Sequence, residues 1–174
     1  TGAQDDLLND DSDADDSASL SVTNISHSNG NTGTVASSST YASNGTQIVG
    51  TYGTLTVGSD GSYTYTADQD AADSIANGSS ETDVFTYTVS DGNGGQDTAT
   101  ITITLTGVND DPVAVNDTNS VSEDGTITVT GAAPNDVLAN DSDPDDSATI
   151  SVSAIQPAGG SVSYTHLRAH ETDR

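Results

Sequence analysis

The residues best suited to do chemistry in this chain are clustered aspartates, which occur in the same pattern at two places 130 positions apart. Each copy carries four carboxylates within six residues: Asp11, Asp13, Asp15 and Asp16, then Asp141, Asp143, Asp145 and Asp146. Carboxylates are hard oxygen ligands, and Ca²⁺ takes about six to eight such oxygens in a flexible geometry that irregular loops can supply. The pattern predicts a Ca²⁺-binding loop in each copy, with a solvated acidic turn as the alternative.

The alternate spacing of these aspartates is similar to the start of an EF-hand loop but departs from it at two positions. An EF-hand needs Gly at the sixth position of its loop and Glu at the twelfth. Asp16 and Asp146 stand at the sixth position, and no Glu stands at the twelfth. The EF-hand is therefore rejected, and a Ca²⁺ loop of another kind is expected.

Two further groups of oxygen-bearing side chains are candidate metal ligands. A Gly-rich reversal could present its ligands across a hairpin, although Gly and Asn are also ordinary turn formers. Acids in a linker between domains could meet acids from a neighbouring domain around one ion. The reversal contributes Asp91, Asn93 and Asp97, and the linker region contributes Asn109, Asp110, Asp117, Glu123 and Asp124.

The charge balance limits the classes of partner. The chain has 27 acidic residues against 2 basic ones, and the two basic residues are Arg168 and Arg174. Two carboxylates about 5 Å apart repel by roughly 3 kcal/mol at an effective dielectric near 20, so cations must come from solution, as divalent ions or concentrated salt. This charge excludes nucleic acid and anionic lipid as partners. No apolar run is long enough to insert in a membrane, and without Cys there is no disulfide or thiolate metal site.

Alternation of apolar and polar residues predicts an all-β fold. Ala99–Leu105 and Phe85–Val89 place Thr on one face and apolar residues on the other, as in strands with one buried side. Leu55–Val57 and Tyr63–Tyr65 form a predicted hairpin through Asp60-Gly61. Short strands joined by Gly and Asx turns are typical of an antiparallel Greek-key sandwich of the immunoglobulin or cadherin kind, about 100 residues long.

The segments between these strands carry weaker signals. Asp91–Gly95 is predicted to reverse the chain between the last two strands, and Asn29–Gly45 is a loose loop or a weak edge hairpin. Ala67–Ala76 has the character of a helical turn or two. Each acidic cluster runs into an alternating apolar stretch, Leu20–Ile25 in the first copy and Ile150–Ile155 in the second, so the whole unit recurs and not only its charge.

The repeat predicts the domain organisation. Residues 1–108 form a first sandwich repeat, and residues 109–161 form a linker and the start of a second repeat. The counterpart of Val113–Thr130 would lie upstream of Thr1, so the sandwich is expected to be truncated at both ends, to lack its opening strands and to expose an unpaired strand edge. Residues 162–174 match nothing in the first repeat, and 162–172 are similar to a translated sequencing adapter. On that interpretation His166, Arg168 and His170 have no role, whereas a zinc or catalytic His pair is the alternative.

Catalysis finds little support in the sequence. There is no Cys, and His27 is the one His outside the last residues, where it is predicted to be an exposed polar residue in a Ser- and Asn-rich loop. Paired carboxylates could in principle cleave glycosides, but they lie in turns and Trp is absent, so no aromatic sugar platform of that kind is available. The sequence predicts a protein that is not an enzyme.

Several consecutive motifs resemble a known class of repeat. They are Gly50–Val57, Asp60–Tyr65, Phe85–Gly95, Thr106–Asp117 and Val137–Asp145. In this order they are similar to the VCBS and cadherin-like tandem repeats of large, RTX-type bacterial surface adhesins. The resemblance implies secreted or surface-tethered repeats used in attachment or biofilm formation, with Ca²⁺ as the stiffening ion and neighbouring repeats of the same chain as partners. The Gly-Gly-x-Gly-x-Asp nonapeptide of the calcium β-roll is missing.

The sequence thus predicts an extracellular or cell-surface spacer repeat of a bacterial adhesin, rigidified by Ca²⁺ at its Asp-rich loops and linkers. Two alternatives keep the fold and change the role: a sandwich that binds glycans or proteins through exposed Thr- and Tyr-bearing strand faces, or an accessory repeat of a secreted carbohydrate-active enzyme. A further alternative treats the acidity as salt adaptation without specific ion sites.

Overall fold

The structure is a computed structural model that describes residues 6–14, 19–131, 136–145 and 148–155. The chain divides into two compact units. The first consists of Thr1–Pro112 together with Asp143–Ala148, and the second consists of Val113–Ser142 together with Thr149–Arg174.

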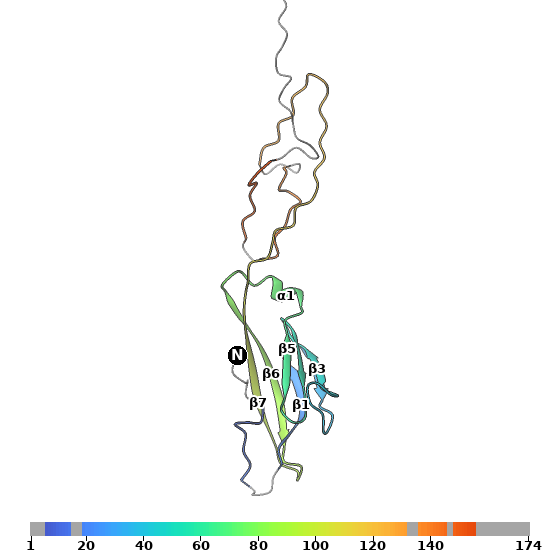
Figure 1. The fold of residues 1–174 in the computed structure, drawn as a ribbon, viewed down its shortest axis with the longest axis vertical. Coiled ribbons are helices and arrows are strands. Elements are labelled where there is room, and N and C mark those ends of the chain that lie inside the picture. The colour runs from blue at the N-terminus through green and yellow to red at the C-terminus, as the bar shows by residue number, and fades with distance from the viewer. Residues whose placement is uncertain (1–5, 15–18, 132–135, 146–147, 156–174) are drawn as a thin grey trace, which may run out of the picture. The chain divides into compact units, whose positions relative to one another are not determined.

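The first unit is a β-sandwich of two antiparallel sheets, as the alternation predicts (Figure 1). One sheet has four strands in the order β2-β1-β6-β7, and the other has three in the order β3-β4-β5. The strands are β1 (Ser21–His27), β2 (Thr32–Thr34), β3 (Thr46–Val49), β4 (Thr54–Val57), β5 (Tyr63–Thr66), β6 (Ser80–Ser90) and β7 (Gln96–Thr106), with one helical turn, α1 (Asp70–Asp73).

Both predicted hairpins form. β4 and β5 pair with Val57 opposite Tyr63, and Gly61 in their turn has a φ of 85°, a backbone conformation that a residue with a Cβ adopts only with strain. β6 and β7 pair along their whole length, from Ser90 opposite Gln96 to Ser80 opposite Thr106. This long ladder positions the Gly-rich reversal at one end of the four-stranded sheet.

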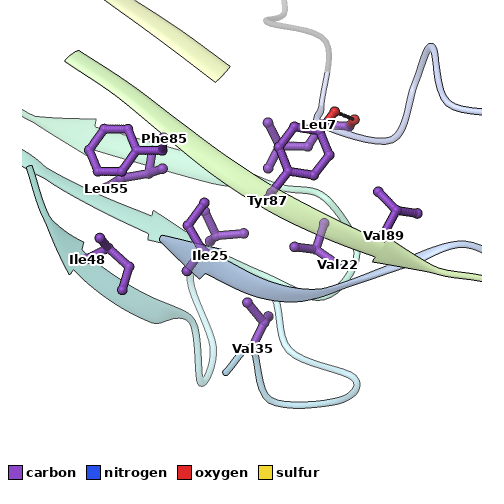
Figure 2. Packing of buried hydrophobic residues seen from close by; sticks show 10 residues of the cluster. Leu7, Val22, Ile25, Val35, Ile48, Leu55, Phe85, Tyr87 and Val89 are labelled. Carbon is purple, nitrogen blue, oxygen red and sulfur yellow. Dashed lines mark hydrogen bonds between the residues drawn. The ribbon is translucent and has the colours of Figure 1, made fainter. Parts of the chain in front are cut away.

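The core lies between the two sheets (Figure 2). Successive residues of a strand point to opposite faces, so on β6 Phe85, Tyr87 and Val89 are buried while the residues between them are largely exposed. Phe85 is fully buried, as are Ile25 of β1 and Leu55 of β4. Burial of each such side chain stabilises the fold by about 1.5–3 kcal/mol.

The Asn29–Gly45 segment, predicted to be a loose loop or a weak edge hairpin, is mostly loop and contributes one short edge strand. β2 has three residues and pairs with β1 at the edge of the sheet, with Asn24 opposite Thr34. β1 itself carries an irregularity between Val22 and Asn24 in its pairing with β6. This irregularity shifts the alternation of β1 by one residue, which determines the side chains that β1 buries.

The second unit has little regular structure in its described residues. Val113 and Ser142 form an isolated antiparallel bridge. The alternating stretch Ile150–Ile155 forms no strand, although its first-repeat counterpart is largely β1. In the first unit β1 is paired with β6. The described residues of the second unit include no strand with which Ile150–Ile155 could pair in the same way.

Among the described residues, none of the helices has the length and apolar character needed to cross a membrane.

Candidate metal sites and a buried polar centre

The first acidic cluster follows a tight turn that begins at Asp6. The backbone N–H groups of Asn9 and Asp11 donate to the carbonyls of Asp6 and Leu8, at 3.3 and 3.2 Å. The N–H of Leu8 donates to Oδ1 of Asp6 at 2.9 Å, the arrangement of an Asx turn. The turn therefore depends on local hydrogen bonds that residues 6–11 provide for themselves.

The second cluster follows a turn with the same three hydrogen bonds. The N–H groups of Ala139 and Asp141 donate to the carbonyls of Asp136 and Leu138, at 2.9 and 3.3 Å. The N–H of Leu138 donates to Oδ1 of Asp136 at 3.4 Å. Each donor and acceptor lies 130 positions after its counterpart, so the repeat seen in the sequence is also a repeat of local structure.

In the first unit, two groups of candidate ligands that the sequence kept separate meet at one pocket of about 310 Å³. Asp11 and Asp13 line it from the acidic turn. Asp91 lines it from the β6–β7 reversal and Asp97 from the start of β7, and Leu20, Val89 and Ala99 add apolar surface. The pocket combines carboxylate oxygens from two segments with an apolar wall, a composition suited to a cation or a small polar ligand.

Asp91 is held ionised by the turn that it closes. Its Oδ1 accepts the backbone N–H groups of Asn93, Gly94 and Gly95, at 2.7, 3.0 and 2.9 Å. These hydrogen bonds, that from Asn93 foremost, hold the pKa of Asp91 below its ordinary value. Oδ1 of Asp97, which also lines the pocket, accepts the N–H of Thr98 at 2.7 Å. Asn93 thus contributes a backbone donor to the reversal.

The second copy of the acidic cluster contains a buried carboxylate. Asp145 is 9% exposed, and its backbone N–H donates to Oδ1 of Asp143 at 3.0 Å. Its Oδ2 accepts the backbone N–H of Asp110 at 3.0 Å. Its Oδ1 is buried without a hydrogen-bond partner among the described residues. An unsatisfied buried oxygen is costly, and a negative one more so.

The surroundings of Asp145 are acidic. Burial raises the pKa of Asp110 above its ordinary value, and the carboxylates of Asp145, Asp73, Asp143 and Asp111 raise it further. Asp73 lies in α1, a segment whose sequence carried no indication of a role in ligand binding. Its contribution was missed because only the fold brings it near the linker.

The remaining candidates are more dispersed. Oδ1 of Asp141 accepts the N–H of Val115 at 2.8 Å within the second unit, and the side-chain amide of Asn109 donates to the carbonyl of Asp110 at 2.6 Å. Asp117, Glu123 and Asp124 are exposed. Asp15, Asp16, Asp146 and the segment 162–174 with His166, Arg168 and His170 lie outside the described residues. Within the described part of the chain, no three Asp, Glu or His side chains converge to hold a metal ion.

His27 is buried, so the prediction of an exposed residue was wrong. Its side chain lies at the end of β1 on the core side, packed against Phe85 with ring centroids 4.9 Å apart. Its Nε2 lies 2.7 Å from Oδ1 of Asp83, and its Nδ1 accepts the backbone N–H of Asn29 at 3.2 Å. Because Nδ1 is an acceptor, the ring proton lies on Nε2 and points to the carboxylate.

Asp83 is the centre of a polar network that the sequence analysis missed. It is 1% exposed, and it accepts the N–H groups of Thr51 and Tyr52 and the hydroxyl of Tyr65, the last at 2.8 Å. Burial raises the pKa of Asp83, but these hydrogen bonds and His27 outweigh it and hold the pKa below its ordinary value. Asp83 thereby joins β6 to β1 and to the opposite sheet.

Comparison with known proteins assigns the class. Residues 1–107 match the bacterial cadherin-like domain, and residues 109–171 match the bacterial Ig domain. The chain belongs to the bacterial cadherin-like domain family. This agrees with the β-sandwich and supports a surface adhesion-type repeat, the coarser part of the predicted resemblance.

One curated relative extends the comparison. The chain is 41% identical over 83 residues to the calcium-binding lectin RapA2 of Rhizobium johnstonii (strain DSM 114642 / LMG 32736 / 3841). The aligned region covers 47% of this chain and 35% of that protein, so the chain spans about a third of its relative. No solved structure matches the chain.

Proposed function

We propose that this chain is a spacer and adhesion repeat of a secreted or cell-surface bacterial adhesin, of the VCBS-containing RTX type, and that Ca²⁺ stiffens it at acidic loops and at the linker to the next repeat. The cadherin-like family supports the adhesion role. Residues 1–161 contain no Lys or Arg to neutralise their carboxylates. The observation that carries the calcium part of the proposal is the buried, unpartnered Oδ1 of Asp145.

A cation explains this arrangement better than a solvated turn does. A solvated carboxylate would keep both oxygens in water, whereas Asp145 is buried and has acidic neighbours. Ca²⁺ would be held by Asp145 together with Asp110, Asp143 and Asp73, with backbone carbonyls or water completing its six to eight oxygens. The proposal requires those side chains to turn toward Asp145 when the ion binds.

The pocket at the β6–β7 reversal is the second proposed Ca²⁺ site. There the ion would link Asp11 and Asp13, from the acidic cluster, to Asp91 of the reversal and Asp97 of β7. Asp91 is well prepared for this role because its backbone hydrogen bonds already favour the ionised form. An ion at this site would fasten the turn to the end of the longest strand pair in the sandwich.

The energetic effect is set by mass action. Extracellular Ca²⁺ modules bind with dissociation constants of about 10⁻⁴ to 10⁻³ M. At millimolar to ten-millimolar calcium, one occupied site contributes about 1–2 kcal/mol to folding stability. In a domain with a small apolar core, two such sites would couple stiffness to the calcium level outside the cell.

Thermal unfolding of the full chain tests this proposal. Melts in calcium, in magnesium and in chelator at matched ionic strength are expected to show a rise of about 5 °C with calcium only. Asp145→Asn is expected to remove part of that rise. Glu81→Gln, which removes one exposed charge on β6, is the matched control and retains the full rise. Equal melts in all three conditions would instead support salt adaptation without specific sites.

Carbohydrate binding is a second candidate function, favoured by the pocket at the reversal. Its carboxylates and its apolar wall of Leu20, Val89 and Ala99 could contact the polar and apolar faces of a sugar. A partial relative is named a calcium-binding lectin. A glycan array probed with the full chain in calcium and in chelator tests this candidate; calcium-dependent binding that Asp13→Asn abolishes would support it, and absence of binding would leave the spacer role alone.

A further inference from the structure

Four Asn-Gly pairs occur in the sandwich, and this dipeptide can deamidate without an enzyme. The backbone nitrogen of the glycine attacks the side-chain amide carbon of the asparagine, and glycine permits this approach because it has no Cβ. The reaction therefore needs an asparagine side chain and a glycine N–H that are not held in hydrogen bonds. The four pairs are Asn29-Gly30, Asn44-Gly45, Asn77-Gly78 and Asn93-Gly94.

The first pair is held at both reacting groups. The Nδ2 of Asn29 donates to the carbonyl of Val49 at 3.0 Å, and its Oδ1 accepts the N–H of Asn31 at 3.0 Å. The N–H of Gly30 donates to the carbonyl of His27 at 3.1 Å. The side chain of Asn29 thus ties the turn between β1 and β2 to the end of β3, and these hydrogen bonds must break before the pair can react.

The third and fourth pairs are held at the glycine. The asparagine of each pair is exposed, but the attacking nitrogen is engaged. The N–H of Gly78 donates to the carbonyl of Gly107 at 3.0 Å. The N–H of Gly94 donates to Oδ1 of Asp91 at 3.0 Å. Asp91 is a poor base for that hydrogen, because its pKa is held below the ordinary value.

The second pair has both reacting groups available. Asn44 is exposed, and its φ of 54° lies in the left-handed region, which Asn tolerates better than most residues. Within the described residues, neither the side chain of Asn44 nor the N–H of Gly45 takes part in a hydrogen bond. The neighbouring backbone is fixed, because Ser43 forms a bridge with Thr40 and β3 begins at Thr46. The available peptide is therefore confined to this one dipeptide.

We propose that Asn44 is the site at which the folded chain deamidates itself. The nitrogen of Gly45 forms a bond to Cγ of Asn44 and closes a succinimide ring. The Cγ–Nδ2 bond of Asn44 breaks, and Nδ2 leaves as ammonia with the proton that the Gly45 nitrogen gives up. Water then breaks one of the two carbonyl–nitrogen bonds of the ring, which leaves either aspartate or isoaspartate. The reaction needs water alone and is independent of calcium.

The reaction changes the start of β3 in the three-stranded sheet. Either product adds a carboxylate to a chain whose net charge is −25, and isoaspartate also adds a carbon to the backbone directly ahead of Gly45. The surroundings leave no room for a shift of this glycine. A Cβ built on it would lie 2.7 Å from Cγ2 of Thr56 and 2.9 Å from the carbonyl oxygen of Tyr41. The reacted chain is therefore expected to melt at a lower temperature than the fresh chain.

Incubation of the full chain in chelator at mildly alkaline pH, followed by peptide mapping with mass spectrometry, tests the proposal. The protease must cleave at residues other than Lys and Arg, because residues 1–161 contain neither. Asn44 is expected to deamidate at least about tenfold faster than Asn29, because each hydrogen bond that must break raises the barrier. In the denatured chain all four asparagines are expected to react at similar rates, since each precedes a glycine.

Two variants test the physical reason for this selectivity. Asn44→Gly removes the reacting amide and keeps a residue that adopts a φ of 54° without strain, so the incubated variant is expected to keep its melting temperature. Asp91→Ala leaves the N–H of Gly94 without its acceptor and is expected to raise the rate at Asn93 toward that at Asn44. An Asn93 that stays unreactive in this variant would contradict protection by the hydrogen bond. Equal rates at the four pairs of the folded chain, or an Asn44 that stays intact there while the denatured chain reacts, would overturn the proposal.

Discussion

The two copies of the acidic turn have the same hydrogen bonds but opposite environments. Leu7, directly after Asp6, is 6% exposed, whereas its counterpart Val137 is 53% exposed. Leu7 donates its N–H to the carbonyl of Gly61. The carbonyl of Leu7 accepts the hydroxyl of Tyr87 at 3.0 Å (Figure 2). The difference shows that local sequence suffices to form the turn, while the sandwich supplies its docking.

The residues that follow the two turns differ in the same way. In the first repeat Val22 and Ile25 are buried in β1. In the second repeat the counterparts Val152 and Ile155 are 48% and 90% exposed. The sequences alternate alike, so alternation alone does not make a strand; a neighbouring strand must be present to pair with it.

Removing the docked side chain should give the largest effect. Leu7→Ala is expected to lower the free energy of unfolding of the first unit by about 2–4 kcal/mol, because it empties a buried site. Val137→Ala is the matched control and is expected to change it by less than about 0.5 kcal/mol. Denaturant unfolding of both variants measures this, and equal effects would show that the two turns are docked alike.

Removing the hydroxyl that holds Leu7 should give an intermediate effect. Tyr87→Phe leaves the ring in place but deprives the buried carbonyl of Leu7 of its donor, at a cost of about 1–2 kcal/mol. Tyr41→Phe, at a tyrosine that is 48% exposed, is expected to be near neutral. If Tyr87→Phe were also neutral, the docking of the turn would rest on apolar contact alone.

The turns themselves should respond differently to loss of their aspartate. Asp6→Ala removes the acceptor of the Leu8 N–H and is expected to destabilise the sandwich by about 0.5–1 kcal/mol, the range of similar caps. Asp136→Ala breaks the equivalent bond in the second turn and is expected to leave the sandwich melt unchanged. Thermal melts followed by circular dichroism compare the two, and a loss with Asp136→Ala would contradict the independence of the second turn.

The pH dependence near the linker should give the smallest effect. Burial and the neighbouring carboxylates raise the pKa of Asp110, so folding favours its protonated form more than the unfolded chain does. Its contribution to stability is present below the ordinary pKa of Asp and is lost as the pH rises through the raised value. Asp110→Asn is therefore expected to flatten the calcium-free pH profile of stability just above the ordinary pKa of an Asp carboxyl. An unchanged profile would mean that Asp110 does not titrate there.

The sheets were predictable because their signals are local. The ladder of β6 and β7 follows from strict alternation, and the β4–β5 hairpin follows from Asp60-Gly61 between two apolar runs. His27 was mispredicted as a loop residue because β1 extends to His27, beyond the predicted Leu20–Ile25 stretch. The irregularity between Val22 and Asn24 shifts the alternation, so that the residue after Ser26 points inward. Asp83 stands at an inward position of β6, two residues before Phe85, and that position was the one available signal of its burial.

Which acidic residues lie close together in the fold was less predictable, because it depends on contacts between residues distant in sequence. The sequence identified Asp110 and Asp145 as candidates but gave no reason to join residues 35 positions apart. It likewise separated Asp11 from Asp91, which line one pocket. Composition indicated that the charges need a cation; only the fold indicates which of them could share one.

Calorimetric titration of the full chain with calcium tests whether the two acidic sites bind Ca²⁺ specifically. We expect binding with dissociation constants of about 10⁻⁴ to 10⁻³ M and no comparable heat from magnesium at equal ionic strength. We also expect loss of one binding event in Asp145→Asn and of another in Asp13→Asn. A titration without heat beyond that of sodium chloride, or one that both variants leave unchanged, would contradict specific binding at these sites.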